Sequence, residues 1–174
     1  MQHFEKADLK RTILILLILF CSCKEQSKTD KKVVEKVIKT DFGLSHSDFT
    51  ILEFNPEWYW IFENSEPIAT DLQLNEISKI EPILEKAISE HNSKLEKDSR
   101  WALGLQRYKR QYVAVINEKG EKEVWINFFC KEDFEYLDWK KELIIVNDGG
   151  NCYFNLKVKL TKGEYYDLHI NGVA

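Results

Sequence analysis

Hydrophobic residues follow three different spacings along this chain, and each spacing predicts a different kind of structure. In the middle of the chain they recur every three or four positions, which places them on one face of a helix. In the second half they alternate with polar residues in short runs, as they do in the strands of a half-exposed sheet. Near the start they form one unbroken block from Ile13 to Phe20. The pattern therefore predicts a long helix and a set of strands, behind an apolar leader.

The longest helical pattern lies between Leu74 and Leu95. Pro82 falls inside it, so we expect the helix either to kink there or to begin there, with the proline in its first turn. Asp71 is a suitable earlier N-cap. A shorter pattern predicts a second helix over Lys31–Thr40. The apolar face of the longer pattern consists of Leu74, Ile77, Ile80, Leu84, Ala87, Ile88, His91 and Leu95.

Alternation and turn residues predict seven strands. Asn55-Pro56 separates the first two, and turns that contain glycine separate most of the later ones. Lys131 to Lys141 is open to two interpretations, a loop or one helical turn. The predicted strands are Phe49–Phe54, Trp58–Phe62, Gln111–Asn117, Glu123–Cys130, Leu143–Val146, Cys152–Thr161 and Glu164–Asn171.

Side-chain chemistry favours one register for the pairing of the predicted strands Glu123–Cys130 and Cys152–Thr161. If Cys130 lies opposite Cys152, apolar residues meet apolar residues on one face, and a shift of one residue would mix them with polar partners. The apolar pairs are Phe128 with Phe154, Ile126 with Leu156, and Val124 with Val158. The pairs on the other face are Phe129 with Tyr153, Asn127 with Asn155, Trp125 with Lys157, and Glu123 with Lys159.

The last two strands give a similar match if a three-residue loop, Thr161–Gly163, joins them. Gly163 would then supply a positive φ. The expected pairs are Leu160 with Tyr166, Val158 with Leu168, Leu156 with Ile170, and Lys159 with Asp167.

The apolar ladders need a cover, and the long helix offers a matching stripe. We therefore expect an α+β fold, with the long helix packed on one face of a curved antiparallel sheet, an N-terminal helix and two additional strands. Such a layout is similar to the cystatin-like or nuclear-transport-factor-like layer arrangement. A likeness of layers does not specify a function.

Composition fits one folded domain, which we place at residues 33–174. The chain has 174 residues, of which 44% are hydrophobic and 13% aromatic, with only seven glycines and three prolines. These values are typical of a chain with a packed core and not of a disordered one. The formal net charge is -4 and no basic stripe is visible, so no nucleic-acid partner is expected.

The apolar leader has the features of a secretory signal. Lys6, Lys10 and Arg11 precede the block from Ile13 to Phe20. The block is shorter than the roughly 20 apolar residues that a membrane-spanning helix needs, and a basic segment followed by a short apolar run is typical of a signal peptide. A short buried core segment is the alternative, although nothing amphipathic flanks the block.

The end of this leader, Leu19-Phe20-Cys21-Ser22-Cys23, resembles the lipobox of bacterial lipoproteins. In that family a cysteine that follows a small residue becomes lipid-modified. Cys23 fits because Ser22 precedes it, whereas bulky Phe20 precedes Cys21. The family usually has leucine three residues before the cysteine, and this chain has Phe20 there.

The resemblance implies a signal peptide over residues 1–22 and cleavage before Cys23. It further implies diacylglycerol on the Cys23 sulfur and an acylated amino group, and several acyl chains together would hold the protein firmly on a membrane. Lys24 follows the cysteine, which by the sorting rule of the family implies the outer membrane. Residues 23–32 are polar and suit a lipidated tether. The C-terminal strands and the closing Asn171-Gly172 are similar to small envelope lipoproteins, a likeness that carries no activity to transfer.

Two further cysteines, Cys130 and Cys152, would remain beside Cys23 after cleavage. They can form a disulfide, which an oxidising compartment permits, or stay as two buried thiols. The chain has neither a CxxC motif nor paired histidines at ligand spacing, so no metal is expected. It also lacks a dinucleotide fingerprint and a P-loop, and no cofactor is expected.

The histidines give catalysis no positive support. His46 suits a loop or a helix cap, His91 a hydrogen-bonded position at the core boundary, and His169 the polar face of the sheet. No serine, cysteine or aspartate stands at a spacing that specifies a triad or dyad. One alternative function is nevertheless a hydrolase or transferase whose site is built from dispersed residues such as His91, His169 and nearby carboxylates.

The polar face of the sheet is the candidate binding surface. Flat aromatic rings with amides between them suit protein interfaces or sugar rings, but the N-terminal helix or the Trp58–Phe62 strand could instead cover this face as a second core. Its expected members are Trp125, Asn127, Phe129, Tyr153 and Asn155, edged by Lys157 and His169.

The leading hypothesis from the sequence is a lipid-anchored envelope protein that acts as a non-enzymatic binding or protein-interaction module. Its partners would be the membrane, through the lipid anchor, and an envelope protein or small ligand. A purely structural envelope component is the other alternative.

Overall fold

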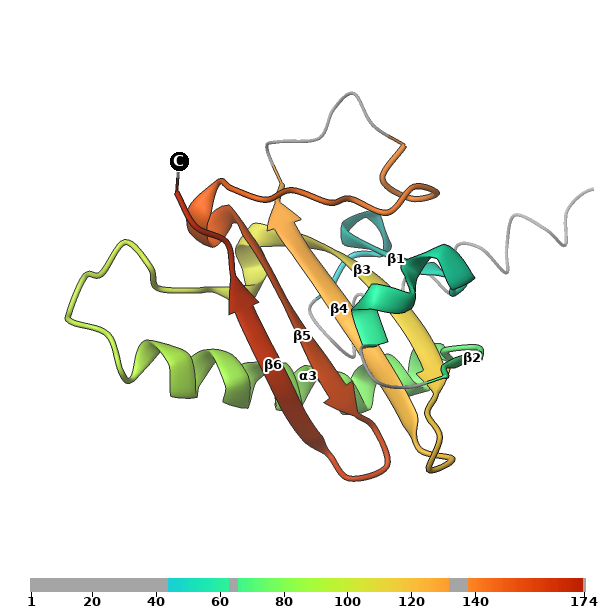
Figure 1. The fold of residues 1–174 in the computed structure, drawn as a ribbon. Helices are drawn as coiled ribbons and strands as arrows, with labels where there is room; N and C mark the ends of the chain where they lie inside the picture. Colours follow the sequence, from blue (N-terminus) through green and yellow to red (C-terminus); the bar gives the residue numbers. More distant parts are fainter. Residues whose placement is uncertain (1–43, 63–65, 132–137, 174) are drawn as a thin grey trace, which may run out of the picture. The chain divides into compact units, whose positions relative to one another are not determined.

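The computed structural model describes residues 44–62, 66–131 and 138–173, which belong to one compact unit. The predicted signal, Cys23, the tether and the helix over Lys31–Thr40 lie outside these residues. The fold is α+β, as predicted, and combines one long helix with a sheet and short 3-10 turns (Figure 1). Its strands are β1 (Phe49–Leu52), β2 (Ile68–Ala69), β3 (Tyr108–Ile116), β4 (Lys122–Cys130), β5 (Tyr153–Lys159) and β6 (Glu164–Ile170). Its helices are α3 (Leu74–Asn92) and the 3-10 turns η1 (His46–Asp48), η2 (Pro56–Phe62), η3 (Leu105–Arg107) and η4 (Gly150–Cys152).

The sheet is mixed, where an antiparallel sheet was predicted. Its order is β1-β3-β4-β5-β6, and β1 runs parallel to β3. A parallel pair needs a long crossover, and the connection from β1 to β3 supplies one because it contains η2, β2 and α3. β2 pairs antiparallel with β3 beyond the end of β1, so the two short strands share one edge of β3.

The expected register of β4 and β5 is confirmed. Phe128 lies opposite Phe154 and their rings stack, with centroids 4.1 Å apart and planes at 6°. Glu123 lies opposite Lys159 at the other end of the ladder. Alternation on both strands is unbroken here, so a one-residue slip would have moved every side chain of one strand to the opposite face of the sheet.

The predicted register of β5 and β6 is wrong. Lys159 pairs with Glu164 instead of Asp167, and the turn between the strands has four residues instead of the expected three. A register shift between Asn155 and Lys157 moves the rest of the ladder by one further residue. Gly163 has a positive φ of 67°, as expected, and Asp167 also has a positive φ of 51°. A bulge of this kind leaves no mark in the hydrophobic alternation that the prediction used.

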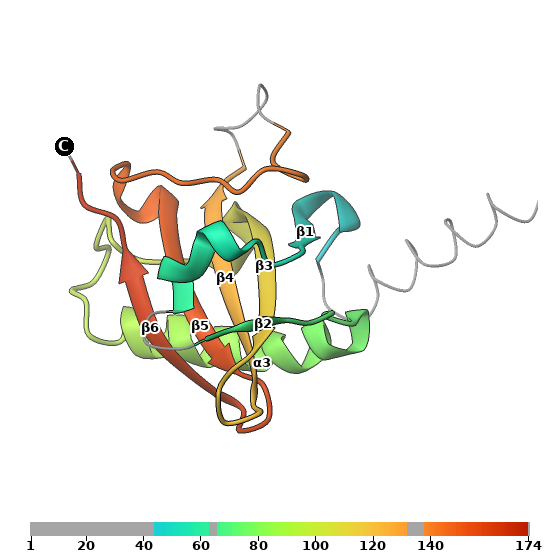
Figure 2. The same ribbon diagram turned by 45° about the vertical axis from the view of Figure 1, so that its right-hand side comes forward.

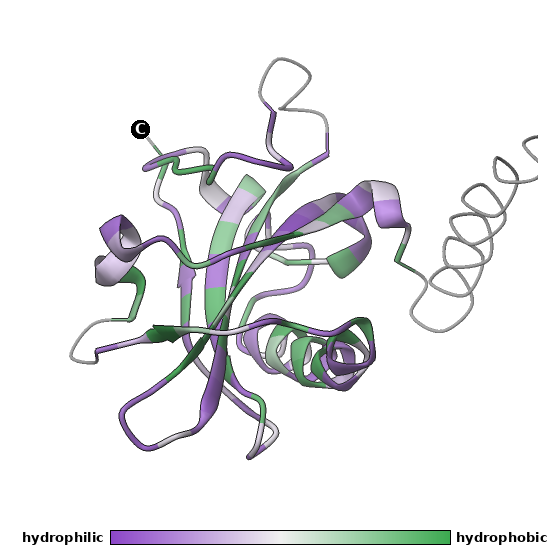
Figure 3. Ribbon diagram, turned by 90° about the vertical axis from the view of Figure 1, so that its right-hand side faces the viewer, coloured by the Kyte–Doolittle hydropathy of each residue, from purple (hydrophilic) through white to green (hydrophobic). Residues whose placement is uncertain are grey.

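Helix α3 crosses one face of the sheet (Figures 1 and 2). It begins well before Pro82, which lies exposed inside it, and the N-cap is Gln73 and not Asp71. The backbone N–H of Gln73 donates to Oε2 of Glu76 at 2.8 Å, half of a capping box. The view along the helix shows its mixture of hydrophobic and hydrophilic positions (Figure 3). Its buried residues, which pack into the main core with one face of β3, β4 and β5, are Ile77, Ile80, Ile83, Leu84, Ala87 and Ile88.

The opposite face of the sheet, which we call the second face, is partly covered by η2. The sequence predicted a strand at Trp58–Phe62, and the structure has a 3-10 turn over Pro56–Phe62 instead. Asn55 starts this turn, because its carbonyl oxygen accepts from the N–H of Trp58 at 2.8 Å and its side chain accepts from the N–H of Glu57 at 3.0 Å. Ile61 and Phe62 are buried against β3 and Trp125 in a second, smaller core.

Residues 138–149, which we call the strap, cover another part of the second face and have no regular structure. The predicted strand at Leu143–Val146 is therefore wrong. Trp139 and Ile144 are buried against Phe129 in a third cluster. The described end of the Lys131–Lys141 segment is a turn, in which the N–H of Lys141 donates to the carbonyl oxygen of Asp138.

Candidate functional site

A row of four polar residues crosses the sheet on the second face. Gln111 of β3 lies opposite Asn127 of β4, which lies opposite Asn155 of β5, which lies opposite His169 of β6. Gln111 and Asn127 are buried, Asn155 is half-buried and His169 is exposed. The sequence predicted the pair in the middle, while Gln111 was not among the candidates.

The inner half of the row, Gln111 and Asn127, holds the strap by hydrogen bonds. The Nε2 group of Gln111 donates to the carbonyl oxygens of Trp139 and Glu142, both at 2.7 Å, and its Oε1 accepts from the N–H of Ile144. The Nδ2 group of Asn127 donates to the carbonyl oxygen of Ile144 at 2.7 Å and to Oε1 of Gln111 at 3.2 Å. Backbone groups buried outside a ladder need such partners. These two amides therefore explain why the strap can lie against the sheet without becoming a strand.

The outer half of the row, Asn155 and His169, does not bind the backbone of the strap. The carboxamide oxygen of Asn155 accepts from the indole N–H of Trp125 at 3.2 Å. Among the described residues, the Nδ2 group of Asn155 and the imidazole of His169 have no hydrogen-bond partner. Both residues line a pocket of about 210 Å³, which lies between η2, the strap and the second face.

The pocket combines aromatic rings with amides. Trp125 is buried and Trp60 of η2 is 42% exposed, with ring centroids 6.4 Å apart and an edge-to-face angle of 81°. Its lining residues are Trp60, Trp125, Asn127, Ile144, Ile145, Val146, Asn147, Tyr153, Phe154, Asn155, His169 and Asn171.

The structure divides the predicted binding face in two. Phe129 is fully buried against Trp139, and Trp125 contributes to the second core, so part of the face is covered by η2 and the strap. Asn127, Tyr153 and Asn155 line the pocket, and so does Trp125. Lys157 does not line it, and its Nζ pairs with the carboxylate of Asp167 at 3.0 Å.

The histidines are not brought together. His91 lies near the end of α3, on the helix side of the sheet, where its Nε2 donates to the carbonyl oxygen of Trp101 at 3.1 Å. His169 lies in the polar row on the second face. His46 lies in η1, whose N-cap is Ser45. A site that combines His91 with His169 has no basis in this geometry.

The hydrophobic pattern did not predict one buried charged cluster. Arg110 of β3 is 1% exposed and lies between α3 and the sheet, where it pairs with the carboxylate of Glu81 and stands 5.5 Å from the ring centroid of Phe128. The hydroxyl of Tyr112 joins the cluster by accepting from Arg110 at 3.3 Å and donating to Glu81 at 3.4 Å. Because β3 was predicted to begin at Gln111, the alternation that places Arg110 on the helix side was not visible.

Burial dominates the electrostatics of this cluster. Loss of solvent raises the pKa of the Glu81 carboxyl, and Arg110 opposes that rise. Burial also raises the pKa of Tyr112 to about 12. Among the described residues, Arg110 Nε has no hydrogen-bond partner. The geometry is that of a buried ion pair that fastens α3 to the sheet.

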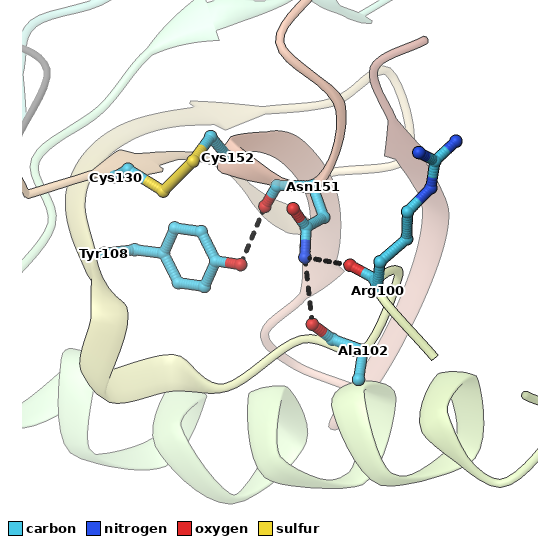
Figure 4. The surroundings of a disulfide bond; sticks show 6 residues. All are labelled: Arg100, Ala102, Tyr108, Cys130, Asn151 and Cys152. Carbon is cyan, nitrogen blue, oxygen red and sulfur yellow. Dashed lines mark hydrogen bonds between the residues drawn. A yellow bond between two sulfur atoms is a disulfide. The ribbon is translucent and has the colours of Figure 1, made fainter. Parts of the chain in front are cut away.

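Cys130 and Cys152 form a disulfide that joins β4 to η4, with Cα atoms 4.9 Å apart (Figure 4). The hydroxyl of Tyr108 donates to the carbonyl oxygen of Asn151 at 2.7 Å. The side-chain amide of Asn151 donates to the carbonyl oxygens of Arg100 and Ala102. A bridge with 22 residues of separation contributes about 3 kcal/mol to the free energy of unfolding.

Within residues 44–62, 66–131 and 138–173, no cluster of histidine, cysteine, aspartate or glutamate side chains is suited to a metal ion. The same residues contain no helix that is both long and apolar enough to cross a membrane. Comparison of the chain with models of known protein families, with curated proteins and with solved structures finds no match.

Proposed function

We propose that this chain is a lipid-anchored protein of the bacterial outer membrane whose folded domain is a non-enzymatic binding module. The ligand would occupy the pocket between η2, the strap and the second face. The observation that carries the proposal is the outer half of the polar row: Asn155 and His169 place unused hydrogen-bonding groups beside two indoles, in a pocket of about 210 Å³.

The disulfide supports the location. Structural disulfides persist in oxidising compartments such as the bacterial periplasm or cell surface, and they are rare in reducing ones. A bridge between Cys130 and Cys152 therefore agrees with export through the predicted signal at residues 1–22 and anchorage through Cys23.

The proposed pocket lies on the second face, across the sheet from α3. We propose that the layers correspond to a cystatin-like or nuclear-transport-factor-like arrangement in one respect, the helix packed across one face of the sheet. The main core fills the space between α3 and the sheet, and the proposed ligand would bind on the other face.

A capture experiment tests the binding function. The tagged full-length chain would be extracted from membranes in a detergent with a polyoxyethylene head group and mixed with an envelope extract. Retained proteins, peptides and glycans would be identified by mass spectrometry. We expect a molecule that is retained by the wild type and lost with a variant that carries Asn155→Ala and His169→Ala.

Lys86→Ala is the matched control, because Lys86 lies exposed on α3, across the sheet from the pocket. Circular dichroism would establish that all variants are folded. Retention that is equal in the pocket variant and the wild type, or no retention by either, would contradict a binding role for this pocket.

A further inference from the structure

Among the described residues, no Asp, Glu, Lys or Arg side chain lines the pocket. The lining consists of four asparagines, one histidine, two tryptophans, one tyrosine and apolar residues. An ion that entered it would lose part of its hydration without gaining an opposite charge, which is unfavourable. The lining therefore favours a neutral ligand.

The unused hydrogen-bonding groups lie along a line. Asn127, Asn155 and His169 are directly opposed neighbours on three adjacent strands. Within the described part of the chain, the Nδ2 donor of Asn155 and the ring of His169 have no hydrogen-bond partner, and Asn127 uses its Nδ2 but not its Oδ1. Directly opposed residues stand about 5 Å apart, a spacing that suits a ligand with several hydroxyls on one rigid ring.

The rings beside this line provide a flat apolar surface. An edge-to-face contact with Trp125 occupies at most one face of Trp60, which is 42% exposed. Trp60 lines the pocket, and part of its indole is accessible for a ligand to stack on. A ring with one face of C–H groups and hydroxyls around its rim would satisfy both the indole and the line of polar groups.

We propose that the ligand is a neutral sugar ring, which stacks on Trp60 and hydrogen-bonds Asn155 and His169 through its hydroxyls. The proposal rests on the proposed binding function of the same pocket. With about 210 Å³ of space, the pocket accommodates a single ring and not a chain of rings, so the recognised unit is a terminal residue or a free monosaccharide.

Ligand-observed NMR with the full-length chain tests this inference. The chain would be held in polyoxyethylene detergent, because detergents with sugar head groups would compete. The probes would be the methyl glycosides of glucose, galactose, mannose and N-acetylglucosamine, with methyl glucuronide as a charged comparator. We expect saturation transfer to the C–H protons of at least one neutral glycoside and little to the glucuronide.

Variants assign the signal to the pocket. Trp60→Ala should weaken binding at least tenfold. Asn155→Asp should do the same, since it keeps the acceptor for Trp125 and removes the donor. Tyr59→Ala is the matched control, because Tyr59 is a neighbouring ring on η2 that is 70% exposed and does not line the pocket; it should leave binding unchanged.

Three results would overturn the sugar proposal: no transfer to any neutral glycoside, stronger binding of the glucuronide, or equal loss with Tyr59→Ala and Trp60→Ala. If the capture experiment retains a protein that depends on Asn155 and His169 while every glycoside is inert, the binding function stands and the sugar ligand is wrong. If neither experiment detects a ligand that depends on the pocket, both proposals fail.

Discussion

At the scale of single residues, Gly149 is held by two constraints that no other residue type meets. Its φ is 85°, and a Cβ on this residue would lie 2.4 Å from the ring of Tyr153. Gly149→Ala should therefore lower the free energy of unfolding by about 2–3 kcal/mol, as measured by urea denaturation, and should displace Tyr153 from the pocket wall.

Gly163→Ala separates the two constraints. Gly163 also has a positive φ, but a Cβ would meet nothing within 4 Å. The loss there should be about 1 kcal/mol. Equal losses of unfolding free energy at the two glycines would mean that the contact with Tyr153 adds nothing to the cost of a Cβ at residue 149.

The raised pKa of Tyr112 predicts how the free energy of unfolding changes at high pH. Burial raises its pKa from 10 to about 12, so the folded state holds the proton more tightly than the unfolded state. The stabilisation is fully present below pH 10 and is lost as pH rises from 10 to about 12, by at most about 2–3 kcal/mol. Urea titrations across this range should show a smaller loss for Tyr112→Phe, and parallel profiles for the two proteins would contradict the assignment.

At the scale of elements, the ion pair of Arg110 and Glu81 links β3 to α3. Glu81→Leu leaves a buried guanidinium without its partner and should cost about 3–5 kcal/mol of unfolding free energy. The double variant Glu81→Leu with Arg110→Met removes both charges and should recover much of that loss. A double variant whose cost equals the sum of the two single costs would show that the pair does not couple the elements.

The same elements show how far the sequence predicts this fold. Strands β4 and β5 were found in the right register because Phe128, Ile126 and Val124 each need an apolar partner across the ladder. Within the strap, Leu143–Val146 was predicted as a strand because a short run of apolar residues is typical of a buried strand. Its backbone partners are Gln111 and Asn127, which are distant in sequence and invisible to a local pattern.

The candidate site was only half visible for a related reason. Alternation placed Trp125, Asn127 and Asn155 on one face, since that requires only the pairing of two strands. The part played by Trp60 depends on η2 folding back over β3 and β4. His169 was predicted on the polar face, but its place opposite Asn155 depends on the register and bulge of the last hairpin. Neither event follows from the local spacing of apolar residues.

At the scale of the whole molecule, a ligand pocket on the second face would serve a protein held at a membrane. The pocket is small, and no Asp, Glu, Lys or Arg side chain stands in its described lining, so we expect weak binding at a single site, whereas many copies on one surface can engage many ligands together. Anchorage would thus contribute to the avidity of the proposed module as well as to its location.

The proposed lipid anchorage can be tested at Cys23. Mass spectrometry of the full-length protein from membranes should find an N-terminus at Cys23 that carries diacylglycerol and an amide-linked acyl chain. Cys23→Ala should lose the lipid, although an uncleaved signal could still hold it on the membrane. A second variant, with residues 1–23 replaced by the signal peptide of a soluble exported protein, should therefore appear in the soluble fraction with its Cys130–Cys152 disulfide intact. Because this variant keeps the folded domain, its persistence on the membrane would show that the domain itself, and not a lipid on Cys23, carries the membrane affinity.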